Sequence, residues 1–240
     1  MVEKQILGIG ATGLLGKPDA DRLKTDGYRV RILARDPQKA QNMFDDTFEI
    51  VQGDVRDLDS LKKAMTGCSG VHISVGGPVD QLSAENVAAL APALGVERIT
   101  YISGATVCEK NRWFHMVAQK LNAEEAIRSC KVAYTIFCPT WPMEMVARFA
   151  RDGSPFMMGK QPNPVHLFAA EDLARMISNA YREDEAANKR FYAYGPESMT
   201  LVEALQRYCQ YFHPGVSKVS VMPIWMAKLM GTLTRNEGLK

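Results

Sequence analysis

The sequence lacks several features that mark whole classes of protein. No window holds about 18 consecutive apolar residues, so we expect no membrane-spanning helix. The first ten residues, MVEKQILGIG, lack the apolar core and cleavage site of a secretory signal. No long basic run suggests nucleic-acid binding, and the formal net charge is only +2. We therefore expect a cytoplasmic protein that binds no nucleic acid and does not span a membrane.

Cysteine is sparse, and its spacing excludes two further classes. The five cysteines, at positions 68, 108, 130, 138 and 209, form no C-x-x-C or other metal-binding spacing. An odd, scattered set does not suit a disulfide framework. We expect buried free thiols in a reducing compartment, and no metal site.

What is present is an ordinary globular composition with a regular alternation of patterns. The 240 residues are 46% hydrophobic and 23% charged, enough for one sizeable domain or two small ones. Strands are expected at 5–10, 28–34, 48–54, 71–76, 97–103, 132–137 and 190–195. Helices are expected over 14–26, 37–43, 57–65, 84–94, 113–129 and 171–183, with Asp57 or Asp59 as a cap of the third. This alternation predicts an α/β fold, a doubly wound and mostly parallel sheet with helices on both faces.

Two segments are less regular, 139–170 and 196–240. We expect residues 1–240 to form a single dinucleotide-binding domain in which these segments build a smaller subdomain. The strand between them, RFYAYG, should return to the main sheet. The stretch PIWMAKLMGTL is amphipathic and predicts a helix packed on the subdomain rather than a membrane anchor. The final TRNEGLK gives no clear ending, which leaves open whether the natural chain extends past Lys240.

Glycines cluster where the first strand meets the first helix. Gly10, Gly13 and Gly16 form GATGLLG, a GxxGxxG motif. At such a junction one glycine permits the tight turn, another lets the backbone approach a pyrophosphate, and a third allows close packing of helix on strand. The alternative is a tight turn that binds nothing, but the position at the first strand–helix junction favours a dinucleotide site. Pro18 is expected in the second helical turn, where it removes one backbone hydrogen bond.

The second expected strand ends in ARDPQKA, which bears on the choice of cofactor. Arg35 and Lys39 suit the 2′-phosphate of NADP, and the Thr12 hydroxyl can add a contact. The alternative is that both are solvated surface charges. Asp36 can pair with Arg35 or serve a ribose hydroxyl. The pattern favours NADP(H), with NAD(H) as the second choice.

The next two strand ends supply further candidates. In GDVRD, Asp54 can accept a hydrogen bond from the adenine amino group and Val55 can pack against the ring; the alternative for Asp54 is an ordinary turn aspartate. After the fourth strand, SVGG places Val75 and Gly76 where the cofactor backbone would pass.

Taken together, these strings resemble the short-chain dehydrogenase/reductase superfamily, and most closely its atypical NmrA-like branch. The matching strings are GATGLLG, VRILARDPQKA, GDVRD, GVERITYISGA, QKLNAEEAIRS, YTIFCPTWPME, AAEDLA and YGPESMT, in the family's order over nearly the whole chain. The resemblance implies a Rossmann-like domain with a small C-terminal substrate subdomain. It also implies NADP(H) binding, by Gly10, Thr12, Gly13, Leu14, Leu15, Gly16, Arg35, Lys39, Asp54, Val55, Val75, Gly76, Ser103, Lys120, Pro139 and Thr140.

The family's usual Ser–Tyr–Lys catalytic set is only partly matched. Lys120 matches the lysine, but Met116 stands where tyrosine is needed, and a thioether donates no proton. Gly104 aligns with the serine and leaves Ser103 one place early. His115 is a candidate acid, with a surface histidine as the alternative. The alternative for Lys120 is an i,i+4 pair with Glu124, which is itself expected to be structural.

The string CPTWPME bears on the substrate. The resemblance places Pro139 and Thr140 beside the nicotinamide and turns Trp141 to the substrate, while Cys138 replaces the family's arginine. A buried, inert Cys138 is favoured over a nucleophile. Trp113 is a second substrate contact. With Phe114, Phe149, Phe156 and Met157 it can form an apolar pocket, although such a set is more often core.

Three functions remain open at this point. The first is NADPH-dependent reduction of a small apolar carbonyl, quinone or enone. The second is a non-catalytic NADP(H)-sensing regulator or complex-associated subunit with a protein partner. A sugar-nucleotide epimerase is third, because that reaction depends most on the missing tyrosine.

Overall fold

The computed structural model describes residues 4–150, 154–216 and 218–226. The chain divides into two compact units. Unit 1 comprises Met1–Thr140 and Ala170–Ala193, and unit 2 comprises Trp141–Ala169 and Tyr194–Lys240. Each unit therefore draws on two separate stretches of sequence.

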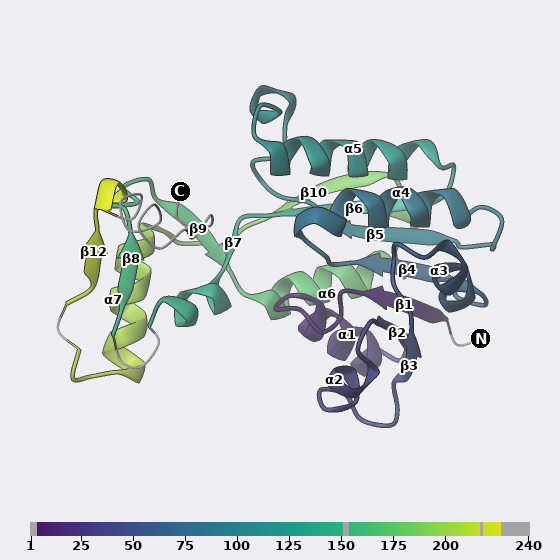
Figure 1. Cartoon of the computed structure of the whole chain (residues 1–240), viewed down its shortest axis with the longest axis horizontal. Coiled ribbons are helices and arrows are strands. Elements are labelled where there is room, and N and C mark those ends of the chain that lie inside the picture. Colours follow the sequence, from purple (N-terminus) through teal and green to yellow (C-terminus); the bar gives the residue numbers. More distant parts are fainter. Residues whose placement is uncertain (1–3, 151–153, 217, 227–240) are drawn as a thin grey trace. The chain divides into compact units, whose positions relative to one another are not determined.

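A seven-stranded parallel sheet forms the centre of unit 1 (Figure 1). The strands lie in the order β10-β6-β5-β4-β1-β2-β3. Their bounds are β1 Gln5–Ile9, β2 Arg29–Ala34, β3 Glu49–Gln52, β4 Gly70–Ile73, β5 Arg98–Ile102, β6 Ala133–Pro139 and β10 Lys189–Ala193. The order reverses between β1 and β4, and ligands of open α/β sheets bind at such a switch point. The predicted Rossmann-like, doubly wound fold is confirmed, with the last strand in the main sheet.

Helices cover both faces of this sheet (Figure 1). Their bounds are α1 Gly16–Thr25, α2 Pro37–Gln41, α3 Leu58–Met65, α4 Asp80–Leu90, α5 His115–Ser129 and α6 Ala170–Ala180, with short 3₁₀ turns η1 Gly77–Val79, η2 Glu109–Asn111 and η5 Asp184–Ala186. Helices α4 and α5 pack together, as do α1 and α6. The largest apolar cluster includes Leu7, Leu61, Val87 and Ile127, and so joins the sheet to α3, α4 and α5.

The first turns of α3 and α1 bear on two of the predictions. Asp57 caps α3, and its Oδ1 accepts from the backbone N–H of Asp59 at 3.0 Å, as predicted. Helix α1 begins at Gly16, so Pro18 lies in the first turn. Bonds of the helical i→i−4 kind flank it, from the Lys17 N–H to the Gly13 oxygen and from the Asp19 N–H to the Leu15 oxygen, both at 3.1 Å. Pro18 has no N–H for the bond between them, so it removes one backbone hydrogen bond as expected, although in the first turn rather than the second.

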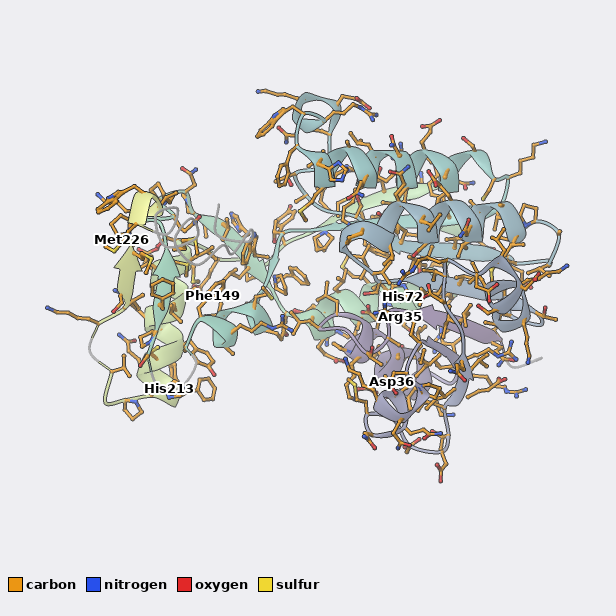
Figure 2. The ribbon with its side chains drawn as sticks, in the orientation of Figure 1. Arg35, Asp36, His72, Phe149, His213 and Met226 are labelled. Atoms are coloured by element: carbon orange, nitrogen blue, oxygen red, sulfur yellow. The ribbon has the colours of Figure 1, made fainter. Side chains whose placement is uncertain are left out.

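A buried polar chain crosses unit 1, and the sequence did not predict it. His72 of β4 bonds Asp19 of α1 through Nε2 at 2.9 Å and Thr100 of β5 through Nδ1 at 2.7 Å. The Thr100 hydroxyl lies 2.8 Å from the hydroxyl of Tyr181, just past α6. Burial raises the pKa of the Asp19 carboxyl. Figure 2 labels His72 within the sheet.

Unit 2 is built from short elements around a small core. Its strands are β7 Trp141–Pro142, β8 Phe156–Met158, β9 Val165–Phe168, β11 Ser198–Met199 and β12 Ser220–Met222, and its helical segments are η3 Met143–Phe149 and α7 Leu201–Phe212. Met157, Leu205 and Cys209 are buried in the core. Thr200 and Glu203 form a capping box at the start of α7. The predicted helix over PIWMAKLMGTL lies outside the described residues from position 227 onward.

The expectation of free, buried thiols is met only in part. All five cysteines are free, but Cys108 is exposed, which contradicts the expectation of uniformly buried thiols. Within residues 4–150, 154–216 and 218–226, no group of His, Cys, Asp and Glu could hold a metal ion. No helix in that part of the chain is long and apolar enough to cross a membrane.

Candidate functional site

The turn between β1 and α1 requires glycine at two positions. Gly10 has φ of 87°, and a Cβ there would lie 2.2 Å from the backbone oxygen of Ser74, at the end of β4. A Cβ on Gly16 would lie 2.1 Å from the Gly10 oxygen. Gly10 therefore makes the tight turn, and Gly16 allows helix α1 to pack against it.

The middle of the same turn faces solvent. Gly13 is exposed, and its N–H donates to the Gly10 oxygen at 2.9 Å. Leu14 and Leu15 are half-buried, and Leu15 occupies the N-cap position of α1 without a side-chain cap. The start of α1 is thus a positively polarised helix end that no side chain covers, which is the arrangement that binds a phosphate group.

Next to this turn lies a cavity of about 350 Å³ in unit 1. It is formed by the turn after β1 and by the ends of β2, β3 and β4. Of the predicted cofactor residues, it is lined by Gly10, Thr12, Arg35, Lys39, Asp54, Val55 and Val75. The lining also includes Arg56 and Val79, which were not predicted to bind the cofactor, and Asp36, for which contact with a ribose hydroxyl was one of two alternatives. Gly76 is exposed just beyond Val75 and is not part of this lining.

Two exposed cations line this cavity, Arg35 just after β2 and Lys39 in α2. Among the ion pairs of the described residues, none includes Arg35 or Lys39. Asp36 makes no ion pair with Arg35 among those of the described residues. Its Oδ1 instead accepts from the Lys39 backbone N–H at 3.1 Å, so Asp36 caps α2. Figure 2 labels both residues in unit 1, with Asp36 below Arg35. The positive pair is therefore free to meet an anion.

Asp54 serves the turn after β3 as well as lining the cavity. Its Oδ1 accepts from the Arg56 backbone N–H at 2.9 Å and from the Arg56 Nε at 3.2 Å. The backbone bond, with the nearby positive charges, holds the pKa of Asp54 below its usual range. The turn role that was one of two alternatives is thus present, and Val55 beside it is buried.

Lys120 does not pair with Glu124, so that alternative is wrong. Its Nζ lies 2.6 Å from Asp80 Oδ2, 2.9 Å from the Ile102 oxygen and 3.4 Å from the Tyr101 hydroxyl. Glu124 is buried, as expected of a structural residue, and accepts from Arg128 at 2.6 Å and from Arg190 at 3.2 Å.

The other candidates around Lys120 are occupied or exposed. The hydroxyl of Ser103 is donated to Glu124, so its proton is already used. His115, the first residue of α5, is exposed, and Met116 is 54% exposed beside it. At Gly104 an added Cβ would meet only Val107, at an ordinary 3.5 Å.

The end of β6 is apolar and closed. Cys138 and Pro139 are buried, and burial raises the pKa of the Cys138 thiol to about 11, in keeping with an inert thiol. The N–H of Thr140 donates to the Ala193 oxygen at 3.0 Å.

The residues of the expected apolar pocket divide between the two units. Trp113 is 83% exposed in unit 1, whereas Trp141 is exposed in unit 2. Trp113 lies against Phe114, and Trp141 lies against Phe149. Met157 belongs to the core of unit 2.

A family comparison agrees with this site. Residues 10–184 match a family model described as NAD(P)H-binding. The chain belongs to this NAD(P)H-binding family. The resemblance to the atypical short-chain dehydrogenases/reductases is confirmed, and so is the assignment of a nicotinamide dinucleotide as cofactor.

Individual relatives have diverse names. The chain is 29% identical over 201 residues to the (4-alkanoyl-5-oxo-2,5-dihydrofuran-3-yl)methyl phosphate reductase of Streptomyces griseus subsp. griseus, which covers 82% of this chain and 70% of the relative. It is 22% identical over 241 residues to a photosystem II assembly factor of Trieres chinensis, with 95% and 75% covered.

Solved structures share the fold. The Citrobacter sp. triphenylmethane reductase complexed with NADP(H) has a TM-score of 0.76 at 21% identity, covering 96% of this chain and 83% of that one. The Escherichia coli NADPH-dependent quinone oxidoreductase complexed with NADPH also has a TM-score of 0.76, at 18% identity, with 95% and 83% covered.

Proposed function

We propose that the chain binds NADP(H) in the cavity of unit 1 and is an NADPH-dependent reductase of a small apolar carbonyl, quinone or enone. The observation that supports this most is the free positive pair, Arg35 and Lys39, beside the glycine turn. A 2′-phosphate would give these cations the ion-pair partner that they lack among the described residues, whereas the 2′-hydroxyl of NADH would not. Two solved structures of the same fold are complexes with NADP(H) or NADPH, which agrees with this choice.

The reaction would be hydride transfer from the nicotinamide to the substrate, completed by a proton. Met116 stands in place of the usual acid, and its thioether cannot supply that proton. A reduced quinone or enone is basic enough to take the proton from water, so this substrate class tolerates the loss best. In this proposal Lys120 contacts the nicotinamide ribose, Pro139 and Thr140 line the nicotinamide, and His115 is a weaker candidate acid. The substrate contacts expected of Trp113 and Trp141, which belong to different units, stay predictions.

The second candidate is a non-catalytic NADP(H)-sensing regulator or complex subunit with a protein partner. The same Met116 favours it, because an enzyme of the usual mechanism would be inactive. One relative bears the name of an assembly factor rather than a reductase. A cytoplasmic location is part of both proposals.

The cofactor proposal is tested by titrating the protein with NADPH and NADH and following tryptophan fluorescence. A charge-assisted contact contributes roughly 1.5–3 kcal/mol, so NADPH should bind roughly 10- to 150-fold more tightly than NADH. Arg35→Ala should remove most of that preference. Lys63→Ala is the matched control, because Lys63 is an exposed lysine of α3 outside the cavity. Equal affinities for the two nucleotides in the wild-type protein would refute the 2′-phosphate site.

Turnover separates the two candidate functions. Steady NADPH oxidation with menadione or another small quinone, followed at 340 nm, would support the reductase. Tight NADPH binding without turnover on quinones, enones or aldehydes would favour the sensor.

A further inference from the structure

The ammonium of Lys120 is held by partners that family resemblance did not identify. Asp80 Oδ2 lies 2.6 Å from Nζ and the backbone oxygen of Ile102 lies 2.9 Å from it. The ammonium also lies 5.0 Å from the centre of the Tyr101 ring, a favourable cation–π distance. Three elements, α4, β5 and α5, therefore converge on one side-chain nitrogen.

Asp80 is itself firmly fixed. Its Oδ1 accepts from the Tyr101 hydroxyl at 2.5 Å, so each of its oxygens has a strong donor. It is the first residue of α4, where the helix dipole favours a negative charge. The Asp80 side chain is only 4% exposed, whereas that of Lys120 is 18% exposed, so the pair is open on the lysine side.

The pair lies at the edge of the sheet where the cofactor is proposed to run. Ile102 is the last residue of β5, and Val79, directly before Asp80, lines the cavity beside the glycine turn. In doubly wound folds the nucleotide crosses this carboxyl edge. An ammonium has three N–H donors, and Asp80 and Ile102 take two of them. The third is donated to the Tyr101 hydroxyl at 3.4 Å, the longest of the three bonds, so it is the one that a ribose hydroxyl can take over.

We propose that Asp80 is a positioning residue, which fixes Lys120 so that one N–H remains for the nicotinamide ribose and which neutralises the lysine charge. This inference rests on the proposed function, because it needs NADP(H) in the site. A neutral ion pair gives little stabilisation to a nearby developing anion. Lys120 is then an anchor for the cofactor rather than an electrostatic assistant to an acid, which fits the absence of a tyrosine at position 116.

Tyr101 does not replace that missing tyrosine. It is fully buried, and its hydroxyl proton is directed at Asp80. Burial, together with the Asp80 carboxylate, raises the pKa of Tyr101 far above its ordinary value. Its role is to hold Asp80 in place.

The test compares two ligands, NADPH and 2′,5′-ADP, by isothermal titration. The second carries the adenosine 2′-phosphate but lacks the nicotinamide ribose. Asp80→Asn should weaken NADPH binding about tenfold, the size of one charge-assisted contact, and leave 2′,5′-ADP within about twofold of wild type. Glu85→Gln is the matched control, because it makes the same chemical change in α4 at a carboxylate bonded to Gln81 rather than to Lys120.

A double-mutant cycle with Lys120→Ala shows whether Asp80 acts through the lysine. NADPH should bind the double variant no more weakly than it binds Lys120→Ala alone. Additive losses, equal losses for both ligands, or an unchanged NADPH affinity in Asp80→Asn would overturn the inference. If Asp80→Asn does not fold, Tyr101→Phe removes the bond to Asp80 Oδ1 and the longer contact with Lys120 Nζ while keeping the carboxylate. About a threefold selective loss of NADPH affinity is expected instead. Failure of the wild-type protein to bind 2′,5′-ADP would instead refute the proposed function itself.

Discussion

The two ends of the candidate cofactor site differ in how their polar side chains are used. Just after β2, Arg35 and Lys39 of α2 are exposed and have no ion-pair partner among the described residues. At the end of β5, Ser103 and the side chain of Lys120 from α5 are bonded to carboxylates of the same unit, Glu124 and Asp80. The first pair can bind an anion, and we call this part of the site the open end. The polar groups of the second pair are already bonded within the unit, and we call that part the closed end. The contrast indicates a site whose side chains are available to bind the cofactor but are poorly placed to exchange protons with a substrate.

The largest effect is expected at the glycine turn that supports the open end. Gly10→Ala would place a Cβ 2.2 Å from the Ser74 oxygen at a φ of 87°. Strain and overpacking together should lower the free energy of unfolding by about 2–4 kcal/mol and abolish NADPH binding. Urea unfolding and nucleotide titration measure the two effects.

Gly8→Ala is the control for that change. Its Cβ would lie 3.5 Å from the Ala11 Cβ, an ordinary contact, two residues earlier in the same strand and turn. It should fold and bind as the wild type does. Similar losses in both variants would show that the turn does not depend on the position of the glycine.

The difference in burial between Cys138, at the end of β6, and Cys108 predicts how the thiols react. Cys138 has a pKa of about 11, so at about pH 8 it should hold roughly 200-fold less thiolate than an ordinary thiol, and burial slows it further. Cys108 is exposed and should react first with a disulfide reagent such as DTNB. Cys108→Ser should remove the fast phase of labelling. A fast phase that instead disappears in Cys138→Ser would mean that the end of β6 is open.

A tyrosine acid can be introduced beside Lys120, and it should raise turnover if the lysine lies near the reacting carbonyl. Met116→Tyr puts a phenol one helical turn before Lys120, and Gly104→Ser fits without a clash. A positioned general acid contributes about 10²–10⁴-fold, and the charge-neutral Lys120–Asp80 pair should reduce this gain to about tenfold. NADPH-dependent reduction of a model aromatic aldehyde measures it. No gain, with NADPH still bound, would separate Lys120 from the reacting carbonyl.

The smallest effect is expected from removing the negative charge beside Arg35 at the open end. Asp36→Ser keeps a side chain that can cap α2 and removes the negative charge beside Arg35. NADPH affinity should rise about two- to threefold, since an exposed charge is worth only about 0.5 kcal/mol. The gain should fade at high salt. Asp36→Ala loses the cap as well, so a lower melting temperature in that variant alone would separate the two roles.

The sheet and the open end were predictable because their signals are local. Alternating apolar runs predict the seven strands, and the spacing of Gly10, Gly13 and Gly16 predicts the first turn. The Asp36 cap was also within reach, since Pro37 after an aspartate is typical of a helix start. Asp36 was instead predicted to pair with Arg35 or to contact a ribose hydroxyl.

The closed end was not predictable because it depends on pairs distant in sequence. Lys120 and Asp80 are 40 residues apart, and Asp19 and His72 are 53 apart. An acidic residue in a short helical pattern is ordinarily a solvated one, and nothing in its neighbourhood indicates a buried partner. The i,i+4 relation of Lys120 to Glu124 therefore suggested the wrong pair.

The path of the chain through its two units has a consequence for synthesis. Unit 1 is interrupted after Thr140 and resumes at Ala170, and its edge strand β10 ends at Ala193. Tyr181, which ends the buried polar chain, also comes from this late segment. While the ribosome is still making these residues, β6 is an uncovered sheet edge and Thr100 lacks its tyrosine partner. The nascent dinucleotide-binding unit is therefore exposed to wrong strand pairing until the second half of the chain emerges.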